Sequence, residues 1–150
     1  MAREKTDETA TTRPLILVAD PFAAEGLAIL RARADVDERH GLDEAGLIAA
    51  LREGCYDALI VRSESRVTSA VLGAAPSLRV VARAGVGVDN IDVAAATRHG
   101  VLVLNMPTGN TVTTAEHTIS LLCAMARNLP QANAAQPDDA KRFAGQLDRP

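Results

Sequence analysis

The chain has 150 residues, of which 47% are hydrophobic and only 2% aromatic, and its formal net charge is −3 at pH 7. These values allow one domain with a core of Val, Leu, Ile and Ala, which is typical of parallel sheets between helices. The acidic balance argues against a nucleic-acid partner, and no stretch reaches the roughly 18 apolar residues of a membrane span.

The two ends of the chain lack a pattern of regular structure. Residues 1–13 are polar and do not resemble a signal peptide, so we expect a disordered leader and a cytoplasmic protein. Residues 131–150 are predicted to form a mobile tail. Cys55 and Cys123 have no Cys/His cluster near them in the sequence, so we expect buried, reduced thiols and no metal site.

Strand and helix patterns alternate between the two ends. Apolar runs predict strands over residues 15–19, 58–61, 80–84 and 101–104, and a weak alternating pattern predicts one over residues 35–39. Helical spacing predicts helices over residues 23–32, 44–52, 69–75 and 93–99. Asp43, Thr68 and Asp92 stand where N-caps are expected. This alternation predicts an α/β fold with a flavodoxin-like, doubly wound, parallel five-stranded sheet over residues 14–110.

The carboxyl ends of the predicted strands carry the candidate ligand-binding residues. In a doubly wound sheet these ends meet at one edge, where ligands bind. The segments that follow the strands are Asp20-Pro21, Arg62-Ser63, Gly85-Val86-Gly87 and Asn105-Met106-Pro107. We therefore expect the four segments to form one site.

The turn Gly85-Val86-Gly87 follows a predicted buried strand directly. Glycine permits positive φ and a close approach of the backbone to a ligand, and consecutive N–H groups in such a turn favour an anion. A tight turn without a ligand is the alternative. A dinucleotide fingerprint is not predicted, because Asn90 stands at its third glycine and the next strand ends in Asn105 instead of an acidic residue.

Arg62 follows a predicted strand and supplies a cation at the same edge. A guanidinium matches the oxygens of a carboxylate or phosphate at two points, and Ser63 adds a hydroxyl donor. An ordinary surface Arg is the alternative, as it is for Arg66 and Arg83, which would strengthen the local positive field. A phosphorylated receiver domain is excluded, because Arg62 and Asn105 occupy the places of its Asp and Lys.

A long helix is predicted after the sheet, over residues 113–128, with Thr113 and Glu116 as a capping box. Its apolar residues, including Leu121 and Met125, surround much of the helix, so it requires cover on more than one side. Another subunit, a missing domain or the core of this domain would provide that cover. His117 is interpreted as a core or interface histidine, because neighbours in a helix point about 100° apart and Glu116 is a poor acid–base partner.

Three sequence blocks resemble the NAD-dependent D-2-hydroxyacid dehydrogenases, and among these the phosphoglycerate dehydrogenases. The similarity extends over residues 15–133, and the blocks are residues 57–63, residues 83–92, and residues 105–111 with 115–118. The family combines a flavodoxin-like substrate domain with an inserted Rossmann domain. The resemblance implies that this chain holds the first segment of the substrate domain and a long interdomain helix, residues 111–130, that contributes to dimerisation, but no Rossmann NAD domain.

The resemblance also implies roles for individual residues. Arg62 and Ser63 would contact a phosphohydroxy acid, and the amides of Gly85, Val86 and Gly87 would contact its carboxylate. Val86 would approach the nicotinamide of NAD. Asn110 would line the cleft between the domains.

The NAD loop and the catalytic Arg, Glu and His of the family fall outside this chain by the same resemblance. We therefore expect a truncated substrate-binding portion without catalytic residues or tight NAD binding of its own. The complete enzyme would oxidise 3-phosphoglycerate to 3-phosphohydroxypyruvate with NAD. Expected partners are a small anionic 2-hydroxy acid and either a second copy or a complementary NAD domain. The alternatives are a non-catalytic dimerisation or regulatory module and a gene fragment.

Overall fold

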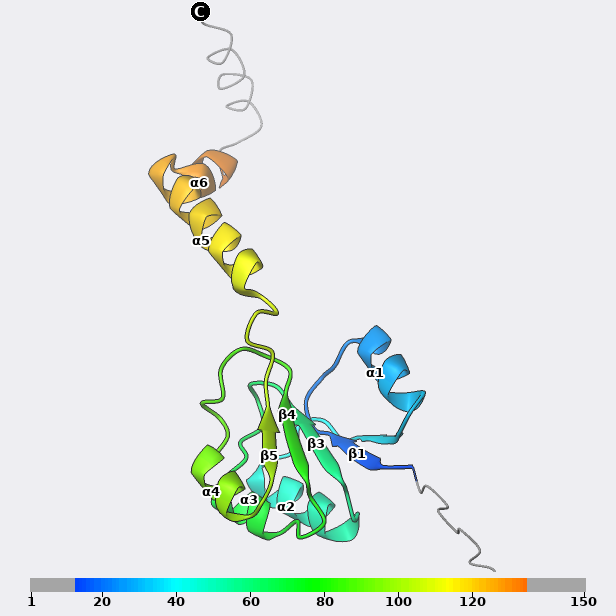
Figure 1. Ribbon diagram of the computed structural model, residues 1–150. Helices are drawn as coiled ribbons and strands as arrows, with labels where there is room; N and C mark the ends of the chain where they lie inside the picture. Colours follow the sequence, from blue (N-terminus) through cyan, green and yellow to red (C-terminus); the bar gives the residue numbers. More distant parts are fainter. Residues whose placement is uncertain (1–12, 135–150) are drawn as a thin grey trace, which may run out of the picture. The chain divides into compact units, whose positions relative to one another are not determined.

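A computed structural model of the chain describes residues 13–134 (Figure 1). It divides into two compact units, one ending at Gly109 and the other starting at Asn110. We call them the N-terminal unit and the C-terminal unit. The predicted leader and most of the predicted tail lie outside the described residues and stay predictions.

The N-terminal unit is a five-stranded sheet in which every pair of neighbouring strands is parallel, in the order β2-β1-β3-β4-β5. This order confirms the predicted flavodoxin-like fold. The elements follow one another as β1 (Leu15–Val18), α1 (Ala24–Arg31), β2 (Asp35–Glu38), α2 (Glu44–Glu53), β3 (Ala58–Val61), α3 (Ser69–Gly73), β4 (Val80–Arg83), α4 (Val93–Arg98) and β5 (Leu102–Leu104).

The predicted N-caps fix where three of the helices begin. Side-chain oxygens of Asp43, Thr68 and Asp92 accept the main-chain N–H three residues further on, at 2.7, 3.4 and 2.8 Å. Each bond satisfies an N–H that has no partner inside its helix. Gly100 follows α4 with a φ of +70°, a conformation that favours glycine.

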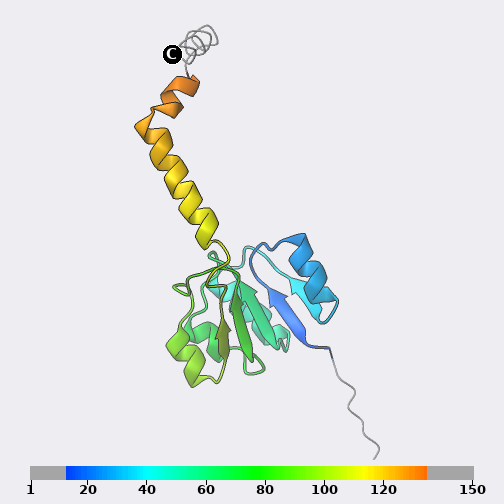
Figure 2. The ribbon, with the colours of Figure 1, turned by 45° about the horizontal axis from the view of Figure 1, so that its top comes forward.

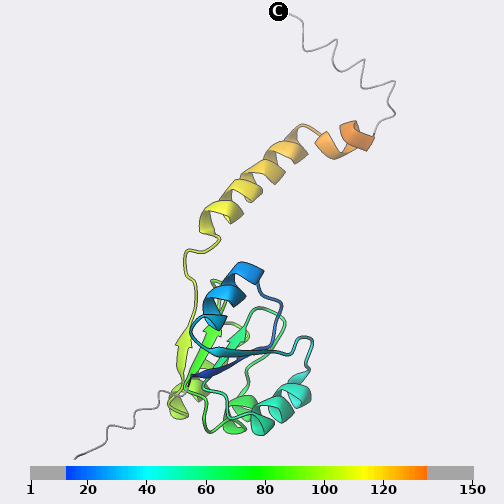
Figure 3. The same ribbon diagram turned by 90° about the vertical axis from the view of Figure 1, so that its right-hand side faces the viewer.

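Helices cover the two faces of the sheet unequally. Helices α2, α3 and α4 pack on one face, where Leu17, Leu59 and Val81 of the central strands are fully buried (Figures 1 and 3). On the other face, α1 covers Ile16 and Val18 through its buried Leu27. The larger core therefore lies on the three-helix face.

The half of the α1 face that is formed by β4 and β5 has no helix over it in the N-terminal unit. Side chains alternate along a strand, so Leu102 and Leu104 point to the same side, where they are 57% and 48% exposed. Shallow cavities of about 520 and 270 Å³ lie along this face, and Leu102 lines the first and Leu104 the second. The surface of the N-terminal unit over β4 and β5 is therefore exposed and largely apolar.

A polar cluster joins α2 to β2 at the edge of the sheet that β2 forms. The hydroxyl of Tyr56, which is 2% exposed, donates to Asp37 at 2.5 Å, and Arg39 donates to Asp37 at 2.9 Å and to Glu53 at 3.2 Å. Burial, together with the bond to Asp37, raises the pKa of Tyr56 to about 12. The same bond lowers the pKa of Asp37 below its usual value.

The C-terminal unit contains α5 (Thr111–Ala126) and α6 (Leu129–Ala134) (Figure 2). Helix α5 begins two residues before Thr113, and the side chain of its N-cap residue, Asn110, accepts no N–H of the helix. The predicted capping box of Thr113 and Glu116 is therefore wrong, because both residues lie inside the helix. Helix α6 also continues regular structure past residue 131, where the sequence pattern stops.

Three further expectations about side chains are corrected. Cys55 and Cys123 are both exposed, not buried, because Tyr56 takes the inward position beside Cys55 and α5 has no buried residue. His117 of α5 is likewise exposed, so it is not a core histidine. Among the described residues, no helix is long and apolar enough to cross a membrane.

Candidate anion-binding site

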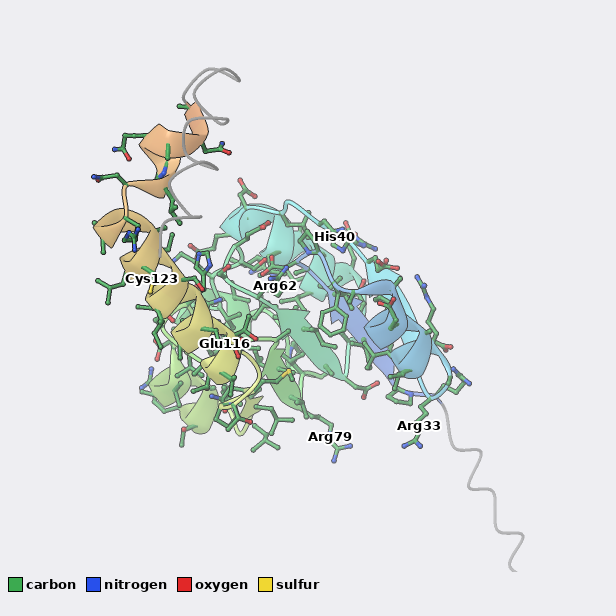
Figure 4. All side chains as sticks on the ribbon, turned by 90° about the horizontal axis from the view of Figure 1, so that it is seen from above. Arg33, His40, Arg62, Arg79, Glu116 and Cys123 are labelled. Atoms are coloured by element: carbon green, nitrogen blue, oxygen red, sulfur yellow. The ribbon has the colours of Figure 1, made fainter. Side chains whose placement is uncertain are left out.

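The carboxyl ends of β3 and β4 lie side by side and bring the predicted site residues of these strands together. Val61 pairs with Arg83 in the last register position, and the N–H of Ala84 donates to the carbonyl of Val61 at 2.9 Å. The residues that follow, Arg62 and Gly85, therefore leave the sheet at the same edge. Figure 4 looks down onto this edge, with Arg62 labelled.

Arg62 and Ser63 are exposed to solvent at this edge. The guanidinium of Arg62 makes one long hydrogen bond, from Nη1 to the carbonyl of Pro21 at 3.3 Å, and forms no ion pair with a described residue. Most of its donors thus remain available to an anion. Arg66, whose side chain the sequence also marked, is exposed as well.

Asp20 holds the main chain of the loop that carries Arg62. The residue is only 2% exposed, and its carboxylate accepts the N–H of Arg62 at 2.5 Å, the N–H of Ser65 at 3.2 Å and the hydroxyl of Ser65 at 2.5 Å. The sequence placed Asp20 among the ligand-facing residues. That placement is wrong, because the carboxylate points into the protein and its oxygens are used by the loop.

Asn90 holds the same loop from the other side. Its Nδ2 donates to the carbonyl of Arg62 at 2.8 Å and to that of Ser65 at 2.7 Å, and Nε of Arg83 donates to the Arg62 carbonyl at 3.1 Å. The peptide groups on both sides of Arg62 are therefore fixed. Sequence reasoning noted Asn90 only as a missing glycine and did not find this role.

The glycine turn offers fewer donors than the sequence predicts. The N–H of Gly85 donates to the carbonyl of Arg83 at 2.9 Å, so it is not available to a ligand. The N–H groups of Val86 and Gly87 donate to no atom of the described residues, and both residues are exposed. Asn105 supports the turn by donating from Nδ2 to the carbonyl of Val86 at 2.7 Å.

The reason for glycine at this turn also differs from the expected one. Among the described glycines, positive φ occurs at Gly41 and Gly100, not at Gly85 or Gly87. A Cβ at Gly87 would lie 2.6 Å from Oδ1 of Asp89 and 2.7 Å from Nη1 of Arg83. The absence of a side chain at Gly87 therefore leaves room for the ion pair between Arg83 and Asp89.

The ion pair over Gly87 joins Arg83 to Asp89 at 3.4 Å. The side chain of Arg83 is 12% exposed and that of Asp89 is 84% exposed. Arg83 is thus an ion-paired residue, which agrees with the alternative that the sequence analysis gave for it, an ordinary Arg. The carboxylate of Asp89 places negative charge beside the turn and weakens its attraction for anions.

The chain does not enter a helix directly after the glycine turn. Ile91 first forms an isolated parallel bridge with Val67, and α4 starts only at Val93. In the dinucleotide fingerprint the glycines open the helix and its N-terminus holds the pyrophosphate. The turn Gly85-Val86-Gly87 therefore does not have the geometry of the dinucleotide fingerprint.

Asn110 belongs to the C-terminal unit, where it is exposed and precedes the first residue of α5. Its main-chain carbonyl accepts the N–H of Thr114 at 2.8 Å. Its role in lining a cleft stays a prediction.

A model of the catalytic domain of the D-isomer specific 2-hydroxyacid dehydrogenases matches residues 16–145 of the chain. The chain belongs to this family. Over 137 residues it is 43% identical to a D-3-phosphoglycerate dehydrogenase of Synechocystis sp., and this match covers 89% of the chain and 24% of that protein. Over 124 residues it is 50% identical to the chloroplastic D-3-phosphoglycerate dehydrogenase 2 of Arabidopsis thaliana, covering 82% and 20%.

Solved structures agree with this assignment. The TT0316 protein of Thermus thermophilus has a TM-score of 0.73 at 32% identity, covering 80% of this chain and 39% of that one. The NAD⁺-bound 3-phosphoglycerate dehydrogenase of Entamoeba histolytica has a TM-score of 0.65 at 27% identity, covering 74% and 38%. The family resemblance predicted from the sequence is confirmed, and the chain spans about a quarter of the length of the curated relatives described above.

Proposed function

We propose that the chain is the substrate-binding portion of an oxidoreductase of the D-3-phosphoglycerate dehydrogenase type. The observation that carries this proposal is the edge of β3 and β4, where two neighbouring loops are held by hydrogen bonds. These loops carry an exposed guanidinium and two amides that donate to no atom of the described residues. The ligand is a small 2-hydroxy acid with two anionic groups, as in 3-phosphoglycerate. The similarity to phosphoglycerate dehydrogenases over most of the chain supports this choice.

Each group at the edge has a distinct task in this proposal. The Arg62 guanidinium binds one anionic group through two parallel N–H donors, and the Ser63 hydroxyl adds a third donor. The N–H groups of Val86 and Gly87 bind the other anionic group. In the complete enzyme, NAD held by a separate domain would accept the hydride. Val86 is proposed to approach its nicotinamide, and Asn110 is proposed to line the cleft between the substrate and NAD domains.

The chain by itself binds substrate weakly and does not transfer hydride. Purified chain, incubated with 3-phosphoglycerate and NAD, is expected to show no NADH formation above background. In an NMR titration with 3-phosphoglycerate, the signals of Arg62 and Gly87 are expected to shift together. Turnover by the purified chain would contradict the proposal.

A matched pair of variants tests the role of the guanidinium. Arg62→Gln removes the charge at the proposed site, so the affinity for 3-phosphoglycerate is expected to fall about tenfold or more. Arg98→Gln removes an exposed charge at the end of α4 and is expected to leave the affinity within about twofold. Equal effects of the two substitutions would show that only the overall charge matters.

A dimerisation or regulatory module is the second candidate, and the surface of α5 favours it. Leu121 and Met125 are 51% and 73% exposed, and none of the residues of α5 is buried. An apolar helix of this kind requires cover from a partner, and we propose a second copy of the chain. A cytoplasmic location is part of both proposals.

Mass measurement in solution tests this second candidate. Leu121→Asp with Met125→Asp is expected to convert a dimer into a monomer. Ile29→Asp, at an aliphatic residue of α1 that is 69% exposed, is the control and is expected to leave the mass unchanged. A wild-type chain that is already monomeric would contradict the proposal.

A further inference from the structure

Two loops carry the two halves of the proposed site. The loop after β3 (residues 62–65) carries the Arg62 guanidinium, and the loop after β4 (residues 85–90) carries the two amides. Main-chain bonds join the loops only at their ends, from Ala84 to Val61 and from Val67 to Asn90, at 2.9 and 2.8 Å. Between these ends, side chains set the separation of the loops in the described structure.

Asn90 is the residue that spans this gap most completely. Its side-chain amide uses Nδ2 for two hydrogen bonds to the opposite loop, at 2.8 Å to the carbonyl of Arg62 and 2.7 Å to that of Ser65. Because both acceptors are carbonyl oxygens, only the Nδ2 end of the amide fits there. The Oδ1 atom is itself buried and accepts no hydrogen bond from the described residues.

A second side-chain contact reaches the loop after β3 from Arg83, the last residue of β4. Arg83 donates from Nε to the carbonyl of Arg62 at 3.1 Å, but this carbonyl also accepts from Asn90, and Arg83 is shared with Asp89. A glycine at position 90, as the dinucleotide pattern requires, would have no side chain to bridge the loops. Asn90 therefore replaces that glycine with a defined spacer.

We propose that Asn90 is a positioning residue that sets the spacing between Arg62 and the amides of Val86 and Gly87. This inference rests on the proposed function. A fixed spacing selects an acid whose two anionic groups are held at a matching separation, and it adds little for a ligand with one anionic group. Asn90 thereby contributes to specificity without touching the substrate.

The test uses the complete chain and two ligands of different size. The variant Asn90→Leu keeps approximately the size of the side chain and adds no charge beside the anion site, but it has no donor for the two carbonyls, so it removes the two hydrogen bonds. NMR titrations with 3-phosphoglycerate and with inorganic phosphate measure the two-anion and one-anion cases. Ser65→Ala is the matched control, because it removes the hydroxyl bond to Asp20, which follows β1, and leaves the bridge between the two loops intact.

A spacing role predicts a selective loss. Asn90→Leu is expected to weaken 3-phosphoglycerate binding about tenfold and to leave phosphate binding within about twofold. The signals of Arg62 and Gly87, which shift with one affinity in the wild type, are expected to follow separate affinities in the variant. Ser65→Ala is expected to leave the ratio of the two affinities unchanged.

Two results would overturn the inference: an equal loss for both ligands, which indicates a merely structural role, or unchanged 3-phosphoglycerate binding in Asn90→Leu. If the wild type binds neither ligand, the proposed function fails and ¹⁵N relaxation decides about Asn90. Increased motion of residues 62–65 against 85–90 in the variant then supports loop positioning, and unchanged motion rejects it.

Discussion

Replacing Asp20 by Ala is expected to destabilise the N-terminal unit more than any exposed substitution. The buried carboxylate accepts three hydrogen bonds, two from main-chain N–H groups of Arg62 and Ser65 and one from the Ser65 hydroxyl. A buried donor left without a partner costs roughly 1–3 kcal/mol. Because Arg62 lies near solvent and the Ser65 hydroxyl can rotate to another partner, we expect a loss of about 3 kcal/mol in the free energy of unfolding.

Urea denaturation followed by the fluorescence of Tyr56, the single tyrosine of the chain, measures this loss. Ser65→Ala removes one of the three bonds and is expected to cost about 1 kcal/mol. Asp89→Ala, at a side chain that is 84% exposed, is the control and is expected to change stability by less than about 0.5 kcal/mol. A loss below about 1 kcal/mol for Asp20→Ala, with an unchanged denaturant slope, would refute the reasoning.

Three further predictions concern titration and charge. Since the pKa of Tyr56 is raised from 10.0 to about 12, the folded state keeps the phenol proton at higher pH than the unfolded state. Stability is therefore lost as pH rises from 10 to about 12. Ultraviolet absorbance of tyrosinate measures this pKa, and a titration midpoint near 10 would contradict the burial argument. Gly87→Ala is expected to displace Arg83 from Asp89. Gly85→Ala is expected to leave the ion pair intact, because the atoms nearest to its added Cβ belong to Arg83 and lie 3.8 Å or more away. The NMR signal of the Arg83 guanidinium separates the two variants, and equal shifts would reject the steric argument. Asp89→Asn removes negative charge beside the turn and is expected to strengthen 3-phosphoglycerate binding about two- to fivefold in low salt; weaker binding would show that the carboxylate organises the turn.

The fold followed from local patterns in the sequence. Local signals within a few neighbouring residues encode the strands and helices: the apolar runs, the helical spacing and the caps Asp43, Thr68 and Asp92. These signals can therefore be recognised without knowing how the elements pack. The shared edge of Arg62 and Gly85 followed from the rule that parallel strands end on one side.

The contacts that hold the site did not follow from the sequence. Asp20 and Ser65 are 45 positions apart, and Asn90 lies 28 positions from Arg62, so no local pattern links these pairs. The capping box failed for a different reason. Several Thr residues near the start of α5 can serve as caps, and only the backbone conformation places the first helical residue at Thr111.

The bridge between Val67 and Ile91 separates the glycine turn from the first residue of α4. A bound anion would therefore gain little from the dipole of that helix, whose effect fades beyond its first turn. Its attraction would come chiefly from one solvent-facing guanidinium, Arg62. Mobile ions screen such a charge over about 8 Å at physiological ionic strength, so occupancy of this edge should fall as the salt concentration rises.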